Sequence, residues 1–574
     1  MTSEIEKSAI ENAKKWLSLK LSSDHSTFIK TGLNDMNTDF VEAFYKDLEF
    51  GTGGMRGVMG VGPNRINTFT LGLATQALAE VLLEEKSNPK VAIAFDSRHN
   101  SLEFSNHLAD ILSANGVEVL IYKALRPTPQ LSFTIREFNC DAGIVITASH
   151  NPPEYNGYKV YGADGCQITA PFDQQLISRV RQTQVESIKS ERQADLVRYL
   201  DTTEDQLYFE AIKSLSLDQK LVSEQSQLPI VYTGLHGTGA RFVKQALEFW
   251  GFGNVIEVEE QASPDGNFPT VKSPNPEEPE ALKMAIELAK KQNAELVLAT
   301  DPDADRVGIA VRNNAGQFEL LNGNETASLL VYYVLNKSKL TGNEFIAKTV
   351  VTSDVLDRIA ECHKVDCVNT LTGFKHIGAA IKALEGKKRY LVGGEESYGY
   401  LIGDLVRDKD AVSSCCMIAE ICAWAKAQNK TMIDLLKEVR IQHGFYKESL
   451  NALTKKGIDG LQEIKRIVEN FRANSPKSFA GEKIIELIDY QSSTKINLVS
   501  GKQESIAFPS SNFMQFITEK QSKITVRPSG TEPKIKFYIS VCNVEVSEAN
   551  YAKVDTDLQN KIECIQKDLG LTVS

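Results

Sequence analysis

Long apolar runs and paired cysteines are missing from this sequence of 574 residues. No run approaches the ~18–20 apolar residues that a transmembrane helix needs. The N-terminal stretch mixes Glu and Lys with apolar side chains, which is unlike a signal peptide. The nine cysteines are odd in number, irregularly spaced and without a C-x-x-C pair, which favours reduced thiols over a disulfide framework. We therefore expect a cytoplasmic protein that does not bind a membrane.

The sequence also lacks the common patterns for zinc and nucleotide binding. Its eight histidines form no H-x-H or H-E-x-x-H cluster, so a His-based zinc site has little support. It contains neither a P-loop nor G-x-G-x-x-G spacing. The net charge of −11 argues against a nucleic-acid binder, which normally has a basic surplus. A local basic pocket for an anionic metabolite stays possible, because net charge does not describe a single cleft.

Short apolar runs that lead into polar or Gly-rich turns indicate the architecture. They lie at residues 91–95, 143–147, 230–232, 295–299 and 390–392. The helical patterns between them include residues 71–85 and 278–291. Strands alternating with helices predict α/β units, in which ligands gather where strands end. At ~150 residues per domain, the length predicts about four domains. We expect an active site assembled from loops of several domains.

Charged and turn-rich stretches indicate where these domains end. Residues 182–203 predict a charged helix that closes a first domain, and residues 313–316 predict a turn near the end of a second. The pattern changes after residues 440–447. Strands at 523–527 and 535–541, around a loop, predict a smaller α+β domain. The residues show no close internal repeat.

The segment Asp301-Pro-Asp303-Ala-Asp305-Arg306 is the most specific local feature. Three carboxylates at alternate positions follow a predicted strand, and such hard oxygen ligands suit Mg²⁺ or Ca²⁺. An EF-hand is excluded, because its sixth and twelfth positions are occupied by Arg306 and Arg312 rather than Gly and Glu. The alternative is an acidic solvated turn. Close carboxylates repel one another without a cation, so we favour a metal site.

Three further segments carry groups that can bind or transfer phosphate. Ser149, at the end of a predicted strand, could be a nucleophile or a phosphoryl carrier, although G-x-S-x-G is absent and a turn serine is the alternative. Residues 393–399 offer two carboxylates and a hydroxyl for sugar hydroxyls. Residues 527–533 offer an Arg, two hydroxyls and backbone N–H groups, which suit a phosphate cradle, the alternative being a hairpin turn.

Four motifs together resemble the α-D-phosphohexomutase superfamily in order and spacing. They are TASHNP at 147–152, DPDADR at 301–306, GEES at 394–397 and RPSGTEP at 527–533. FGTGGMRG at 50–57, TASHNPPEYNGYKVY at 147–161 and TGFKHIG at 372–378 are most similar to its phosphoglucomutase/phosphomannomutase branch. The resemblance implies three similar α/β domains with mixed sheets and a smaller α+β C-terminal domain around a central cleft. We place these domains at residues 1–205, 206–318, 319–445 and 446–574.

The resemblance also implies roles for individual residues. Ser149 would be the phosphoserine carrier, and one Mg²⁺ per chain would be held by Ser149, Asp301, Asp303 and Asp305. Sugar hydroxyls would be bound by Glu395 and Ser397, and the non-reacting phosphate by Arg527, Ser529, Gly530 and Thr531. Basic active-site positions of the family are matched by Arg56, Lys159, Arg306 and Lys375. We expect catalytic roles for Arg56 and Lys159, with Lys159 either helping proton transfer or only steadying phosphate. His150 would position the serine loop.

This resemblance predicts a phosphosugar mutase of the isomerase class. The expected reaction interconverts glucose 1-phosphate and glucose 6-phosphate, with glucose 1,6-bisphosphate as intermediate and activator. The GEESYG loop favours glucose, and Ala304 stands where the family often has Gly. The alternatives are mannose, pentose or amino-sugar phosphates as substrates, a Mg²⁺-dependent phosphatase, or a catalytically silent sugar-phosphate-binding protein. The expected partners are small hexose phosphates, and the expected assembly is a monomer or a homodimer.

Overall fold

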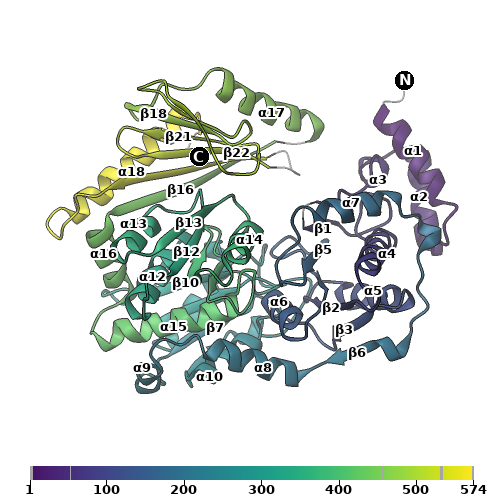
Figure 1. Ribbon diagram of the computed structural model, residues 1–574, viewed down its shortest axis with the longest axis horizontal. Helices are drawn as coiled ribbons and strands as arrows, with labels where there is room; N and C mark the ends of the chain where they lie inside the picture. Colours follow the sequence, from purple (N-terminus) through teal and green to yellow (C-terminus); the bar gives the residue numbers. More distant parts are fainter. Residues whose placement is uncertain (1–3, 52, 456, 530–533, 572–574) are drawn as a thin grey trace.

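The computed structural model describes residues 4–51, 53–455, 457–529 and 534–571, which form four sheets in chain order (Figure 1). Three helices pack together before the first sheet: α1 (Glu4–Trp16), α2 (Ser23–Asp35) and α3 (Thr38–Phe44). Figure 1 shows the first sheet beside these helices and the fourth sheet at the opposite side of the molecule. No helix among the described residues is long and apolar enough to cross a membrane.

The first sheet is mixed and has helices on both faces. Its order is β1 (Gly54–Val58), β5 (Tyr155–Gly162), β4 (Ala142–Ile146), β2 (Lys90–Phe95), β3 (Glu118–Tyr122) and β6 (Val197–Leu200). Side chains alternate across a strand, so Val91 and Ile93 of β2 join one core with α4 (Thr68–Glu85), α5 (Ser101–Ala114) and α7 (Phe172–Gln182). Ala92 and Ala94 face α6 (Thr128–Glu137) on the other side.

The second and third sheets are also mixed. The second has the order β11 (Phe318–Leu321), β10 (Val307–Arg312), β9 (Leu296–Thr300), β7 (Ile230–Thr233) and β8 (Val255–Glu257). The third has the order β13 (Asp366–Thr370), β12 (Glu344–Thr349), β14 (Arg389–Gly394) and β15 (Tyr400–Ile402).

Nine α-helices belong to this part of the described chain. They are α8 (Thr202–Lys213), α9 (Gln219–Glu224), α10 (Phe242–Trp250), α11 (Pro279–Lys291), α12 (Gly323–Lys337), α13 (Val355–Cys362), α14 (Phe374–Leu384), α15 (Ala411–Ala427) and α16 (Met432–His443). A short 3₁₀ turn lies at Glu259–Gln261.

The fourth sheet is antiparallel. Its order is β16 (Phe445–Thr454), β23 (Lys534–Asn543), β22 (Lys523–Pro528), β21 (Met514–Thr518), β18 (Glu482–Asp489), β19 (Thr494–Asn497) and β20 (Gln503–Ser505), with β17 (Ser478–Phe479) paired to β18. Two helices accompany it, α17 (Gly457–Ala473) and α18 (Tyr551–Asp568). Three mixed α/β sheets and a distinct β-rich C-terminal unit confirm the expected fold class.

The prediction of a helix at residues 182–203 is wrong. Only single 3₁₀ turns form there, at Val185–Ser187 and Ala194–Leu196, before strand β6. The reason is that α4 and α5 supply partners for the backbone: Lys189 N donates to Gln76 Oε1 (3.3 Å) and Gln193 N donates to Ser113 Oγ (3.2 Å). With these side-chain acceptors available, the segment runs along the two helices instead of forming its own hydrogen-bonded helix.

All four sheets carry one of the motifs in the same kind of place. In each of the first three, a strand with one parallel neighbour leads into a loop and an antiparallel return strand: β4–β5, β9–β10 and β14–β15. The fourth motif joins the antiparallel strands β22 and β23. The repeat is therefore one of topology, which residue identity does not show. It places four motif loops at the ends of four hairpins.

Helix α15 joins the second and third sheets into one core. It is buried almost throughout and packs against β9, α10, α12 and β15. Its Glu420 is fully buried and accepts five hydrogen bonds, from Ser216 Oγ, the backbone N of Leu217 and Asp218, Trp250 Nε1 and Tyr333 Oη, at 2.7–3.0 Å. The carboxylate thereby ties α10, α12 and the connection between α8 and α9 to α15.

Candidate active site

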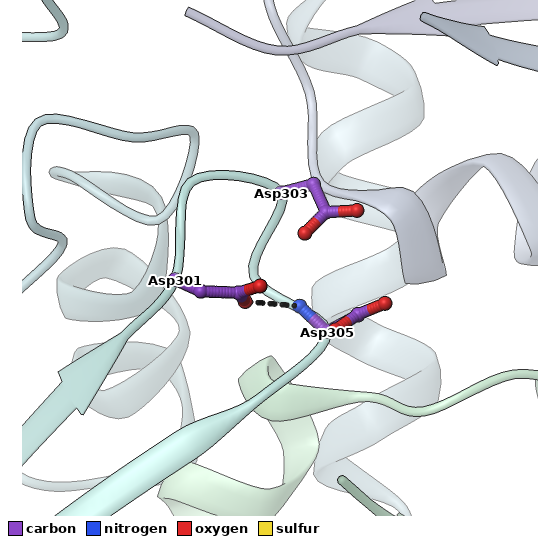
Figure 2. Close-up of side chains that lie close together, drawn as sticks. All are labelled: Asp301, Asp303 and Asp305. Atoms are coloured by element: carbon purple, nitrogen blue, oxygen red, sulfur yellow. Dashed lines mark hydrogen bonds between the residues drawn. The ribbon is translucent and has the colours of Figure 1, made fainter. Parts of the chain in front are cut away.

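The loop between β9 and β10 holds three buried carboxylates close together. One oxygen from each of Asp301, Asp303 and Asp305 lies within 4.8 Å of the others (Figure 2). The loop closes on itself because Asp301 Oδ1 accepts hydrogen bonds from the backbone N of Asp305 (3.1 Å) and Arg306 (3.0 Å). Figure 2 shows the bond to Asp305.

The chemistry of this cluster fits a hard divalent cation. Asp303 Oδ1 and Asp305 Oδ1 are buried and have no hydrogen-bond partner among the described residues. Burial and the neighbouring Asp303 and Asp305 raise the pKa of Asp301 well above its ordinary value. A small oxygen-seeking ion such as Mg²⁺ would satisfy the unpartnered oxygens and offset the repulsion. The predicted ligands thus form a group that could bind Mg²⁺.

Two lysines already neutralise part of this charge. Lys159 Nζ donates to Asp303 Oδ2 (2.8 Å) and lies 3.4 Å from Asp305 Oδ2. Lys409 Nζ lies 3.0 Å from the same Asp305 oxygen. Burial alone would lower the pKa of Lys159, but Asp303 and Asp305 outweigh it and raise the pKa above its usual range. Lys159 is therefore an ammonium at neutral pH, and its part in proton transfer or in steadying phosphate stays a prediction.

Ser149 lies against the carboxylate cluster although it comes from another sheet. Its Oγ donates to Asp301 Oδ2 at 2.6 Å. Ser149 has the left-handed φ of 52°, which turns the chain sharply after β4. The turn is held by Thr147 Oγ1, which accepts from Ser149 N (2.9 Å). The side chain is buried but aimed at the site where a cation would lie.

Arg98 fixes the loop that carries Ser149. Its guanidinium donates to the backbone O of Ser149 (2.6 Å), Pro152 (2.8 Å) and Tyr155 (3.0 Å), and also to that of Asn151. One buried side chain thus orders four carbonyls.

His150 lies beside the serine hydroxyl. Its Nδ1 is 3.2 Å from Ser149 Oγ. Burial, with the cations Arg306 and Arg56 nearby, lowers the pKa of His150 well below its ordinary value, so the ring is neutral at neutral pH.

A large cavity of about 880 Å³ opens beside these loops. Its wall comes from loops beside the first sheet, from the loop after β9 and residues 275 and 277 before α11, and from the third and fourth sheets with their connections. Six residues expected from the sequence lie in this wall: His150, Arg306, Lys375, Glu395, Ser397 and Arg527. Further cations line it as well, namely Lys409, Lys523, Lys534 and Lys536. The cavity therefore suits a polyanionic ligand with hydroxyl groups.

The loop with Glu395 and Ser397 is tied to its surroundings by backbone contacts. Glu395 Oε1 accepts from Gly373 N (2.8 Å), just before α14, and Val307 N donates to Tyr398 O (3.0 Å). Burial raises the pKa of Glu395 above its usual value. The loop thus connects the third sheet to the start of β10, next to the carboxylate cluster.

The remaining expected residues lie outside this wall or outside the described chain. Arg56 is exposed on β1 and donates to Asn151 Oδ1 (3.0 Å) at the serine loop. Ser529 closes the β22–β23 hairpin, where its N donates to Lys534 O (2.7 Å). Gly530 and Thr531 lie outside the described residues.

Sequence reasoning missed two groups at the cluster. Lys409 follows β15 in the run Arg407-Asp408-Lys409-Asp410, all of it buried. Four consecutive charged residues before a strongly apolar helix were a signal that a site could lie there. Thr128, at the start of α6, donates through Oγ1 to Asp303 Oδ2 (3.0 Å) and through N to Asp303 O (2.9 Å). A lone threonine gives no comparable signal.

Comparisons with known proteins agree with this fold. Residues 47–186, 206–316 and 322–441 match the alpha/beta/alpha domains I, II and III of phosphoglucomutase/phosphomannomutase, respectively. A phosphoglucomutase of Staphylococcus haemolyticus is 36% identical over 92% of this chain and 96% of its own. A phosphoglucomutase of Staphylococcus aureus MRSA252 is 36% identical over 87% of this chain and 90% of its own.

Solved structures show the same fold. A putative phosphomannomutase from Thermus thermophilus superposes with a TM-score of 0.67 at 24% identity, covering 90% of this chain and 99% of its own. The pp63/parafusin structure from Paramecium gives 0.67 at 19% identity, covering 91% and 95%.

Fold, site and relatives together define an enzyme of the mutase type, in the isomerase class. The chain belongs to the phosphoglucomutase/phosphomannomutase family of the α-D-phosphohexomutase superfamily.

Proposed function

We propose that the chain interconverts glucose 1-phosphate and glucose 6-phosphate through phosphorylated Ser149 and a glucose 1,6-bisphosphate intermediate. The observation that carries this proposal is the 2.6 Å contact between Ser149 Oγ and Asp301 Oδ2, next to a cavity lined with cations. Relatives at 36% identity that are named phosphoglucomutase support glucose as the sugar.

In this proposal, phosphorylated Ser149 and Asp301, Asp303 and Asp305 would hold Mg²⁺, which supplies charge neutralisation for the transferring phosphoryl group. Lys159 and Lys409 add positive charge from the chain itself. Arg527 and the lysines of the fourth sheet bind the phosphate that does not react, while Glu395 and Ser397 bind sugar hydroxyls. Phosphoryl transfer needs chiefly positioning and electrostatic stabilisation, which this arrangement supplies.

The reaction runs in two matched transfers. In the first, the Ser149 Oγ–P bond breaks, a P–O6 bond forms on glucose 1-phosphate, and a proton passes from the O6 hydroxyl to Ser149 Oγ. The bisphosphate then turns so that its O1 phosphate faces Ser149. In the second, the O1–P bond breaks, an Oγ–P bond forms, the proton on Ser149 Oγ passes to O1, and glucose 6-phosphate leaves. Wall groups on several sheets suit a sugar that binds in two orientations.

A coupled assay tests this function. Purified protein with Mg²⁺, glucose 1-phosphate and a trace of glucose 1,6-bisphosphate should form glucose 6-phosphate. Ser149→Ala should abolish this turnover, because it removes the phosphoryl carrier, while Ser187→Ala on the surface should not change it. Near-normal turnover in Ser149→Ala would remove Ser149 from its role.

The same assay separates the alternative substrates and activities. Mannose, pentose and amino-sugar phosphates are measured beside glucose 1-phosphate, and the one with the highest kcat/KM is the substrate. Release of inorganic phosphate without an isomer would identify a phosphatase. Tight binding of a sugar phosphate without any turnover would identify a silent binding protein.

A further inference from the structure

The serine loop (residues 147–154) and the carboxylate loop (residues 301–306) come from different sheets, yet their side chains meet at hydrogen-bond distance. A contact this short requires other residues to fix the position of one loop relative to the other. Two connections of the second sheet make contacts on either side: residues 234–239 after β7 contact the carboxylate loop, and residues 261–270 after β8 contact residues 97–99. The first is the Gly-rich run Gly234-Leu-His-Gly-Thr-Gly239, for which the proposed reaction has no role.

Residues 237 and 238 hold the carboxylate loop by its backbone. Thr238 N donates to Pro302 O at 2.7 Å, between Asp301 and Asp303. Gly237 lies so close that an added Cβ would be 2.3 Å from Pro302 Cα. A Cβ at position 237 would overlap the backbone of Pro302, which cannot move aside as a flexible side chain could. Only glycine therefore allows the two backbones to lie this close.

His236 ties this end to residues 261–270. Its Nδ1 donates to Ser263 O (3.1 Å), because a carbonyl can only accept, and its Nε2 pairs with Thr270 Oγ1 (2.8 Å). Its backbone N donates to Gln261 O (3.2 Å), and Asp265 N donates to its backbone O (3.0 Å). Four hydrogen bonds from one buried residue make the two segments a single rigid unit.

At the other end of this unit, residues 266–268 contact residues 97–99, which include the Arg98 that holds the serine loop. A Cβ on Gly266 would lie 2.7 Å from His99 N, so the backbones of 266 and 97–99 are in close contact. The ring of Phe268 lies 5.1 Å from the guanidinium carbon of Arg98. His99 Nε2 also pairs with Asn267 Oδ1 (2.9 Å). Arg98 in turn binds three carbonyls of the serine loop and that of Tyr155 at the start of β5.

We propose that residues 234–239 and 261–270 form a brace that sets the position of Ser149 relative to the three aspartates, with His236 and Phe268 as positioning residues. The brace touches the backbone of one loop and the anchor of the other, and it reaches no part of the cavity wall that binds sugar or phosphate. This inference rests on the proposed function for its kinetic consequences but not for its structural ones.

Three variants and one control test the brace. Phe268→Leu keeps an apolar side chain but removes the ring over Arg98. His236→Ala removes both side-chain bonds, while His236→Asn keeps a donor near the Nδ1 position and suits the φ of 63° at this residue. Phe252→Leu is the control, since it makes the same change at a buried phenylalanine in the core around α10.

Misplacing reacting groups by about 1 Å can lower a rate ~100-fold. Phe268→Leu and His236→Ala should loosen the position of Ser149 relative to the aspartates only in part, so kcat should fall about tenfold. KM for glucose 1-phosphate should change less than about twofold, because uniform binding is untouched. The Mg²⁺ concentration for half-maximal activity should rise. His236→Asn should recover part of the loss, and Phe252→Leu should match the wild type.

Hydrogen exchange by mass spectrometry gives a readout that needs no turnover. Peptides covering 147–155 and 300–306 should exchange faster in Phe268→Leu and His236→Ala than in Phe252→Leu. If folded variants keep wild-type kcat, Mg²⁺ response and exchange, or if Phe252→Leu loses as much, the brace is overturned. If the wild type isomerises no sugar phosphate, the proposed function fails, and the exchange comparison still decides the brace.

Discussion

Ser149 and Asp301 show how much of the site depends on single side chains. The serine hydroxyl donates to an aspartate whose other oxygen already closes its own loop through two backbone N–H groups. Asp301 therefore cannot turn away from Ser149 without opening the loop. Asp303 and Asp305 each keep an unpartnered oxygen, while their second oxygens face lysines. A preorganised cation site requires ligands that are held in place and oxygens that are free to bind the ion. Asp301 meets the first requirement, and Asp303 and Asp305 meet the second.

Asp303→Asn should weaken Mg²⁺ binding and lower activity together. Mutating a residue that only hydrogen-bonds to a metal ligand typically lowers metal affinity ~10–100-fold. Because Asn lacks the charge of a direct ligand, Asp303→Asn should lower activity at fixed Mg²⁺ by about 100-fold or more. A Mg²⁺ titration of activity and binding calorimetry check this. Asp366→Asn, at an exposed ion pair with Lys388, is the control. A titration curve equal to the wild type would remove Asp303 from the ligands.

Single residues could be predicted only where the sequence has a local signal. The three aspartates stand at alternate positions in one short loop, so their convergence follows from chain geometry alone. Ser149 could be named only as one motif among four. Its contact with Asp301, 152 residues away, depends on how two sheets pack, which no local pattern encodes. Lys409 and Thr128 reach the cluster in the same way.

At the scale of elements, strand positions were predictable because buried strands are short and apolar. The run 143–147 corresponds to β4 and the run 295–299 to β9, within one residue. The return strands β5 and β10 were less visible, and with them the hairpins that carry the motifs. The helix prediction for residues 182–203 was wrong because backbone groups of this segment bond to side chains on α4 and α5. The periodicity within the segment carries no information about such distant partners.

Helix α15 should be the element most sensitive to a change of one atom. Glu420→Gln replaces one acceptor oxygen by a donor NH₂, so at least two of the five donors lose their acceptor, one of them the buried Trp250 Nε1 or Tyr333 Oη. An unsatisfied buried donor costs ~1–3 kcal/mol, so the free energy of unfolding should fall by about 3 kcal/mol. Denaturant unfolding checks this. Glu438→Gln at a partly exposed pair with Lys430 should change it little, and an equal effect of both variants would contradict the argument.

At the scale of the molecule, the cavity exists only because the sheets face one another. Its wall takes Arg306 from the loop after β9, Lys375 from α14, Glu395 from the loop after β14 and Arg527 from β22. Lys534 and Lys536 of β23 add charge that the sequence did not single out. The net charge of −11 hides this basic surface, which depends on where the cations are gathered rather than on their number.

Arg527→Ala should weaken substrate binding without slowing the chemical step. The phosphate that Arg527 is proposed to bind is present in both ground state and transition state, so its loss should raise KM and leave kcat within about twofold. A hydrogen bond to a charged group contributes ~1.5–3 kcal/mol, which corresponds to about a 10–100-fold rise in KM. Steady-state kinetics check this against Lys495→Ala, a surface change in the same sheet. A fall in kcat at constant KM would contradict the assignment.

The contact between the third and fourth sheets should make stability depend on pH. Glu448 of β16 lies in the cavity wall, and burial raises its pKa to about 7, against the opposing effects of Ser353 and Lys523, with Glu325 adding to the rise. The folded protein therefore keeps this proton at pH values where the unfolded chain, with the ordinary Glu pKa of 4.5, has lost it. This group's contribution to stability is fully present below the ordinary pKa, falls as the pH rises toward about 7, and is flat above that.

Glu448→Gln mimics the protonated form and removes this dependence. Its melting temperature should exceed that of the wild type above pH 7, and the difference should shrink as the pH is lowered toward 5. Thermal unfolding across pH 5–8 measures both curves. Glu486→Gln, at a pair with Lys495 in the same sheet, is the matched control and should follow the wild-type curve. Parallel curves for wild type and Glu448→Gln would mean that Glu448 is already ionised in the folded protein, and that the wall of the cavity is open to water at this point.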